Sequence, residues 1–92
     1  MGRVADTIRA KLSAGLHPTR LDIVDESHRH AGHAGARFEG ESHFQVAIVS
    51  SAFAGQSRVA RQRLVYSLLA QELRTDIHAL SLITLTPDED KV

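Results

Sequence analysis

Three histidines lie close together in the first half of the chain, in the run His28-Arg29-His30-Ala31-Gly32-His33. Imidazole binds zinc, iron, copper and nickel, and histidines this close in a glycine-containing loop could converge on one metal ion. The alternative is a polar loop whose imidazoles hydrogen-bond locally or face solvent. The spacing of these residues leaves both interpretations open.

Two further histidines stand at the expected starts of strands. His78 precedes the apolar pair Ala79-Leu80, and His43 begins an apolar run. A lone histidine at a strand end is more often a structural residue with satisfied hydrogen bonds than a metal ligand. If the strands lie in sequence order, however, the histidine loop and the start of the third strand could meet at one rim of the sheet.

A different chemistry is indicated by the segment from Gly55 to Arg63. A glycine turn leading into a helix presents backbone N–H groups and a favourable dipole to phosphate, and Arg58, Arg61 and Arg63 add charged donors. The alternative is a helix with solvated arginines. The sequence contains no Walker-type phosphate loop and no dinucleotide-binding fingerprint.

Neither acidic cluster predicts catalysis. Asp25, Glu26, Ser27 and His28 are adjacent residues that alternate across a strand, so they cannot all meet one substrate. We therefore expect the protein not to be an enzyme. The run Asp88-Glu89-Asp90 is interpreted as a solvated, frayed tail.

Length and composition limit the possibilities further. A chain of 92 residues with 42% apolar and 24% charged residues predicts one globular domain over 1–92, with a core over about 3–87 and a flexible tail over 88–92. Eleven basic residues balance eleven acidic ones, so any contact with nucleic acid must be local. The absence of cysteine excludes disulfides and thiolate ligands from this chain. No apolar run reaches the roughly 20 residues of a membrane span, so we expect a cytoplasmic protein without a membrane partner.

The periodicity of apolar residues predicts a helix, two strands, a helical region and a third strand. The first helix covers about 3–14, with Gly15 as its C-terminal cap, and the first two strands cover 20–27 and 43–51. Ser57 is the expected N-cap of a helical region that reaches about residue 74. An unbroken helix would place Arg58 and Arg61 over its apolar face, so we predict a break near Arg61.

The third strand is expected over 77–85. A helical crossover between the second and third strands makes them parallel, while the first two strands pair antiparallel. The predicted class is therefore α+β, with the order αββααβ and a three-stranded mixed sheet packed by helices.

Several sequence blocks, taken together, resemble the BolA family over about residues 21–87. They are Asp25-Glu26-Ser27-His28-Arg29-His30, Glu41-Ser42-His43-Phe44-Gln45-Val46, Phe53-Ala54-Gly55, Arg61-Gln62-Arg63-Leu64-Val65-Tyr66, Glu72-Leu73 and Ile77-His78-Ala79-Leu80-Ser81-Leu82. The resemblance implies an αββααβ fold similar to class II KH domains, in agreement with the order expected from periodicity.

The resemblance also implies a partner and a cofactor. The resemblance implies that the chain partners a monothiol glutaredoxin and that the two proteins share a bridging [2Fe–2S] cluster. Thiolates of the partner and of glutathione would hold this cluster together with ligands from the BolA-like chain. Members that lack a loop cysteine are thought to use a loop histidine and the histidine of the His-Ala-Leu block, which correspond here to His30 and His78. The loop is expanded in this sequence, so His33 is an alternative ligand. The apo form is expected to be a monomer without a cofactor.

The same resemblance implies an alternative function as a DNA-binding transcriptional regulator. In that case Gly55, Arg58, Arg61 and Arg63 would contact nucleic-acid phosphates. The family's Arg-His-Arg block is Arg61-Gln62-Arg63 here, so one titratable group is absent from that helix. The neutral overall charge argues against tight binding.

Overall fold

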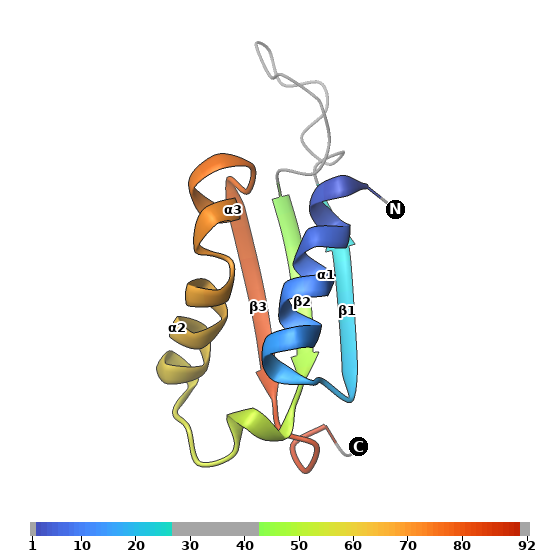
Figure 1. Cartoon of the computed structure of the whole chain (residues 1–92). Helices are drawn as coiled ribbons and strands as arrows, with labels where there is room; N and C mark the ends of the chain where they lie inside the picture. The colour runs from blue at the N-terminus through green and yellow to red at the C-terminus, as the bar shows by residue number, and fades with distance from the viewer. Residues whose placement is uncertain (1, 27–42, 91–92) are drawn as a thin grey trace.

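The structure is a computed structural model that describes residues 2–26 and 43–90 (Figure 1). Its elements confirm the predicted α+β class and order. They are, along the chain, α1 (Arg3–Leu16), β1 (Arg20–Asp25), β2 (His43–Val49), the short 3₁₀ helix η2 (Ser51–Phe53), α2 (Arg58–Leu68), α3 (Ala70–Thr75) and β3 (Ala79–Leu85). Each predicted strand is present, although each is two residues shorter than expected.

The sheet has the predicted order and strand directions. The order is β1-β2-β3, with β1 antiparallel to β2 and β2 parallel to β3. Alternate residues of the central strand, Phe44, Val46 and Ile48, are buried in the core with Leu12 of α1 and Leu69 beside α3. This period of two is what a sheet with one packed face requires. The intervening positions, such as Ile83 of β3, remain more exposed.

These strand directions create two different rims. The end of β1 and the starts of β2 and β3 lie at one end of the sheet, because residue 43 pairs with Ala79 and the Glu26 N–H donates to the His43 carbonyl. We call Glu26, His43, His78 and Ala79 the histidine rim. At the opposite end, shown at the bottom of Figure 1, the chain leaves β3 and turns toward its C-terminus. We call Arg20, Arg61, Thr86, Glu89 and Asp90 the C-terminal rim.

The first helix is longer than predicted, and the expected role of Gly15 as its cap is wrong. The helix continues through Gly15 to Leu16, and His17 provides the left-handed C-cap, with φ of 47°. A β-carbon at position 15 would lie 2.9 Å from both methyl carbons of Leu68. Glycine is therefore suited to this position because it allows α1 and α2 to approach closely.

The predicted N-cap is confirmed, but the predicted break near Arg61 is wrong. The Ser57 hydroxyl accepts a hydrogen bond from the Ala60 N–H at 3.1 Å, and α2 then runs unbroken to Leu68. The break falls at Leu69, whose φ is −107° and ψ is 18°. Arg61 needs no break because its guanidinium has acceptors at the rim: it donates to the carbonyls of Gln56 and Thr84 at 2.9 and 3.0 Å.

The acidic segment after β3 differs from the predicted solvated tail at two residues. Glu89 accepts two hydrogen bonds from the guanidinium of Arg61, at 2.6 and 3.1 Å, and a third from the Thr86 N–H at 2.9 Å. Hydrogen bonding from Arg61 is the main cause that lowers the pKa of Glu89 to about 2. Asp90 pairs with Arg20 at 3.2 Å. Glu89 and Asp90 are therefore held by ion pairs, although Glu89 remains exposed to solvent.

Candidate functional site

The central feature of the histidine rim is a pair of imidazoles from two neighbouring strands. His43 is the first residue of β2, and His78 immediately precedes β3. Their ring centroids are 6.2 Å apart, and their ring planes are inclined by 39°. His78 is exposed, whereas His43 is half-buried. The parallel register brings together two side chains that are far apart in the sequence.

The spacing of the two rings suits partial metal ligation. Two imidazoles on one ion, with metal–nitrogen bonds of about 2.1 Å, have ring centroids roughly 5 Å apart. The observed separation is only slightly larger, so small side-chain rotations would allow both rings to reach one ion. Imidazole also matches iron, zinc and copper in ligand preference. The pair is therefore suited to contribute part of a metal coordination shell.

The pair cannot complete such a shell with the described residues alone. In the ranges 2–26 and 43–90, no group of three or more histidine or carboxylate side chains is arranged to hold a metal ion. Glu26 lies at the same rim, yet it does not form a three-residue group with the two histidines. Additional ligands would have to come from elsewhere, either from the rest of the chain or from another molecule.

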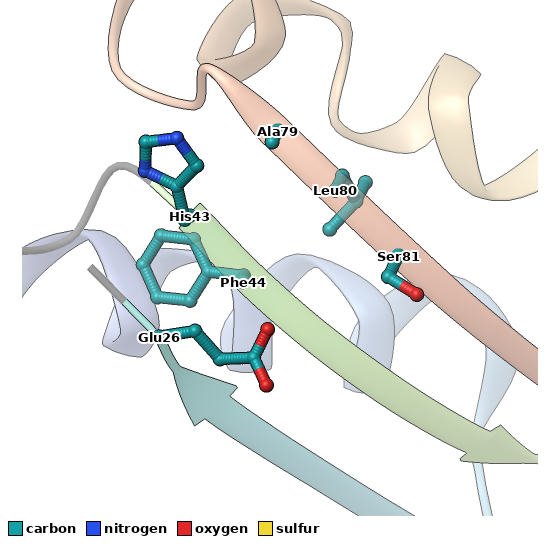
Figure 2. A pocket seen from close by; sticks show the side chains of 6 residues that line it. All are labelled: Glu26, His43, Phe44, Ala79, Leu80 and Ser81. Carbon is teal, nitrogen blue, oxygen red and sulfur yellow. The ribbon is translucent and has the colours of Figure 1, made fainter. Parts of the chain in front are cut away.

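A shallow depression of about 280 Å³ adjoins His43 (Figure 2). It is lined by Glu26, His43, Phe44, Ala79, Leu80 and Ser81. In Figure 2, Glu26 approaches from the end of β1, while Ala79, Leu80 and Ser81 follow β3 on the other side of β2. Sites for drug-sized ligands are usually larger, about 300–1,000 Å³. The depression therefore suits a small group presented at the rim better than an enclosed substrate.

The residues predicted as metal ligands differ in whether the structure describes them. His30 and the alternative ligand His33 lie outside the described residues. Glu26 and His43, which flank the segment 27–42, both lie at the histidine rim. His78 lies at this rim as the sequence-based strand order suggested. The sequence favours a structural role for the neighbouring residue His43. The expected parallel pairing of β2 with β3 was the signal that could have placed His43 beside His78.

The predicted phosphate-binding residues lie near the other end of the sheet. Gly55 has a φ of 76°, and a β-carbon there would meet nothing within 4 Å, so its glycine is required by the backbone conformation. Arg58 and Arg63 are exposed. Arg61 differs, because its side chain is only 11% exposed and is bound to Glu89. The two proposed kinds of site therefore do not share a surface.

None of the helices described in residues 2–26 and 43–90 has the length and apolar character needed to cross a bilayer. The longest of them, α1, contains 14 residues. A membrane-spanning helix needs about 20.

Comparison with known proteins identifies relatives over nearly the whole chain. The chain is 45% identical over 86 residues to the DNA-binding transcriptional regulator BolA of Escherichia coli, a match that covers 94% of this chain and 78% of that protein. It is 51% identical over 87 residues to the chloroplastic protein BOLA1 of Arabidopsis thaliana. That match covers 92% of this chain but 54% of the relative, so the chain spans about half of BOLA1.

The solved structures agree with this relationship. The BolA domain of SufE1 from Arabidopsis thaliana matches with a TM-score of 0.86 and 46% identity, over 97% of this chain and 98% of that one. The sequence model of the BolA family, described as "BolA-like protein", matches residues 12–89 of this chain. The histidine rim and the C-terminal rim both lie within or directly beside this matched region. On the extent of the family match and the level of identity, this chain belongs to the BolA family.

Proposed function

We propose that this chain is a non-enzymatic adaptor that supplies imidazole ligands to a [2Fe–2S] cluster shared with a monothiol glutaredoxin and glutathione. In this role the cluster is cargo for iron–sulfur trafficking or a signal for iron or redox sensing. The proposed ligands are His78 and a loop histidine, His30 or His33. The observation that carries the proposal is the placement of His78 beside His43 at the histidine rim.

The incomplete donor set supports a shared cluster. The described part of the chain offers two adjacent imidazoles and no larger ligand group. The chain has no cysteine, so sulfur ligands must come from another molecule. Glutathione and a thiol-bearing partner would supply the missing ligands. His43 is a second candidate beside His78, because its ring centroid lies 6.2 Å from that of His78.

The type of ligand supports a transferable cargo. Replacing thiolates by neutral imidazoles reduces the negative charge around an iron–sulfur cluster and raises its reduction potential. His78 is exposed, and the depression beside His43 is shallow and open to approach from outside. A partner could therefore reach the ligands without unfolding the core. These features suit release of the cluster better than permanent retention.

The test is the visible absorption and circular dichroism of the chain co-purified with a monothiol glutaredoxin. We expect His78→Ala to remove or strongly shift the cluster bands, and His30→Ala to do the same if His30 is the loop ligand. His33→Ala and His43→Ala assign the remaining candidates. His17→Asn is the matched control, because it removes an exposed imidazole away from the histidine rim and asparagine tolerates the left-handed backbone. Unchanged spectra in His30→Ala and His78→Ala would reject the ligand assignment.

A second candidate function is DNA binding, and one observation favours it. A relative with 45% identity is named as a DNA-binding transcriptional regulator. Exposed Arg58 and Arg63 flank the first turns of α2, close after the Gly55 turn. Arg61 is a weaker candidate, because Glu89 occupies its guanidinium.

Salt dependence distinguishes this function. Loss of Arg58 or Arg63 should weaken binding to duplex DNA and reduce the slope of log affinity against log salt by about one. The absence of measurable binding at about 50 mM salt would reject DNA binding, because electrostatic contacts are strong under those conditions.

A further inference from the structure

A partly buried ion pair joins α1 to α3 at the edge of the core, with the Lys11 side chain 36% exposed and that of Glu72 9% exposed. Glu72 is only 7% exposed, and its Oε2 accepts a hydrogen bond from the Lys11 ammonium at 2.7 Å. Its other oxygen, Oε1, is buried without a hydrogen-bond partner among the described residues. Lys11 precedes Leu12, and Glu72 follows Leu69 by one helical turn; both leucines are fully buried. The charges therefore lie directly beside the apolar core.

Stability is a poor explanation for this arrangement. Removing a carboxylate from water is costly, and well-packed apolar residues often stabilise a protein as much as a buried ion pair, or more. The unpartnered Oε1 adds to that cost. A directional ion pair can nevertheless fix one relative position of two helices, which interchangeable apolar contacts do less well. A role in fixing the relative position of α1 and α3 therefore explains the ion pair better than stability does.

The backbone of Glu72 also takes part in the turn that leads to His78. Its backbone carbonyl accepts hydrogen bonds from the N–H groups of Asp76 and Ile77, both at 2.8 Å. These bonds close α3 and direct the chain toward β3. Ile77 is 4% exposed and therefore anchored in the core, and His78 is the next residue. Any displacement of the last turn of α3 would be passed along this short connection to the His78 ring.

We propose that Lys11 and Glu72 are positioning residues for the histidine pair. Their ion pair holds the end of α3 against α1, and the turn at Asp76 and Ile77 then holds His78 beside His43. This inference rests on the proposed function for the role of the pair, and it adds two residues that touch no ligand. It assigns a geometric role to a buried carboxylate that is costly for stability.

The experiment measures Ni²⁺ binding to the full chain by calorimetry, with no partner present. All variants carry His28→Ala, His30→Ala and His33→Ala, so that loop imidazoles do not contribute to the signal. In this background, His78→Ala is the reference for loss of the pair. The test variant Lys11→Met/Glu72→Met replaces the ion pair by apolar side chains of similar length. Arg9→Met is the matched control, because it removes an exposed positive charge from the same helix.

We expect the double variant to keep or raise the melting temperature while its Ni²⁺ affinity falls about tenfold, a loss typical of removing support from metal ligands. Arg9→Met should leave the affinity unchanged. Glu72→Gln keeps a hydrogen-bonding side chain near Lys11 and should retain most of the affinity. The separation of affinity from stability identifies positioning, because a purely structural role would change both together.

Two results would overturn the inference, and they are distinguishable. If His78→Ala weakens Ni²⁺ binding but the double variant does not, the histidine pair stands and the positioning role fails. If His78→Ala has no effect, the pair itself does not bind metal, and the proposed function loses its main support as well. Should the double variant fail to fold, Lys11→Met replaces it: a clear loss of affinity supports the inference, and an unchanged affinity overturns it.

Discussion

The two rims of the sheet differ in the polar side chains that they carry and in how these side chains are arranged. At the C-terminal rim, Arg61 and Glu89 form a two-bond ion pair, and Arg20 is paired with Asp90. At the histidine rim, two imidazoles lie side by side, and His78 is exposed. One rim pairs its charged groups with one another, and the other places two imidazoles next to each other.

Under the proposed function, this difference separates stability from ligand supply along the axis of the sheet. Ion pairs at the C-terminal rim join α2 and β1 to the segment after β3. Beside this rim, Ser50 donates to the carbonyls of Leu16 and Leu85 and so links the ends of α1, β2 and β3. The histidine rim instead places two neighbouring imidazoles next to a shallow depression. Substitutions at the C-terminal rim should therefore change folding stability without changing the cluster spectrum. The following predictions concern stability at the C-terminal rim and in the chain beside it.

Ser50→Ala should have the largest effect on stability. The Ser50 hydroxyl is fully buried, donates to the Leu16 carbonyl at 2.6 Å and accepts from the Ala52 N–H at 3.1 Å. Its loss leaves both backbone groups without this partner and should cost about 1–3 kcal/mol of unfolding free energy. Urea denaturation measures this loss. A changed cluster spectrum in a folded Ser50→Ala protein would contradict the separation of the two rims.

Gly55→Ala should have a smaller effect. The substitution meets no steric neighbour, but the φ of 76° at this position is unfavourable for residues with a β-carbon. We expect a loss of about 1 kcal/mol in thermal or chemical denaturation. Gly55→Asn is the control and should lose less, because asparagine adopts this conformation more readily. Equal losses for alanine and asparagine would show that backbone strain is not the cause.

Glu89→Gln should give the smallest effect, and that effect should depend on pH. The pKa of Glu89 is lowered from 4.5 to about 2 by Arg61 and Thr86, so its ionised form stabilises the folded state. This contribution is complete above the unfolded-state pKa and is lost as the pH falls toward 2. Wild type should therefore melt a few degrees higher than Glu89→Gln at pH 7, with the difference vanishing near pH 2. A constant difference at all pH values would contradict this assignment.

Apolar periodicity predicted the fold because the core follows it closely. Phe44, Val46 and Ile48 alternate on β2, and their burial reproduces the pattern expected from the sequence. The break between α2 and α3 could not be placed, because the sequence around Leu69 contains neither glycine nor proline. The charge of Arg61 near an apolar helix face suggested a helix break at that residue instead. Acceptors distant in sequence, Thr84 and Glu89, accommodate its guanidinium without a break.

The candidate site was predictable only in part. His78 could be placed at a rim from the strand order, whereas its contact with His43 depends on the register of two parallel strands. The buried face limits the register of β2 and β3, but these strands are joined by helices, so no hairpin turn is present to fix the register further. The same limit applies to Glu89, whose partner Arg61 lies 28 positions away. The roles of His30 and His33 remain predictions from the resemblance to the BolA family.

The parallel pairing of β2 and β3 also determines when the histidine pair can exist during synthesis. His43 emerges from the ribosome well before His78, and the two can meet only after the intervening helices have packed and β3 has joined the sheet. A nascent or truncated chain that ends before β3 carries the first imidazole without its neighbour. Formation of the histidine pair is thus coupled to completion of the fold, so an unfinished chain would lack the two neighbouring imidazoles on which the proposed function rests.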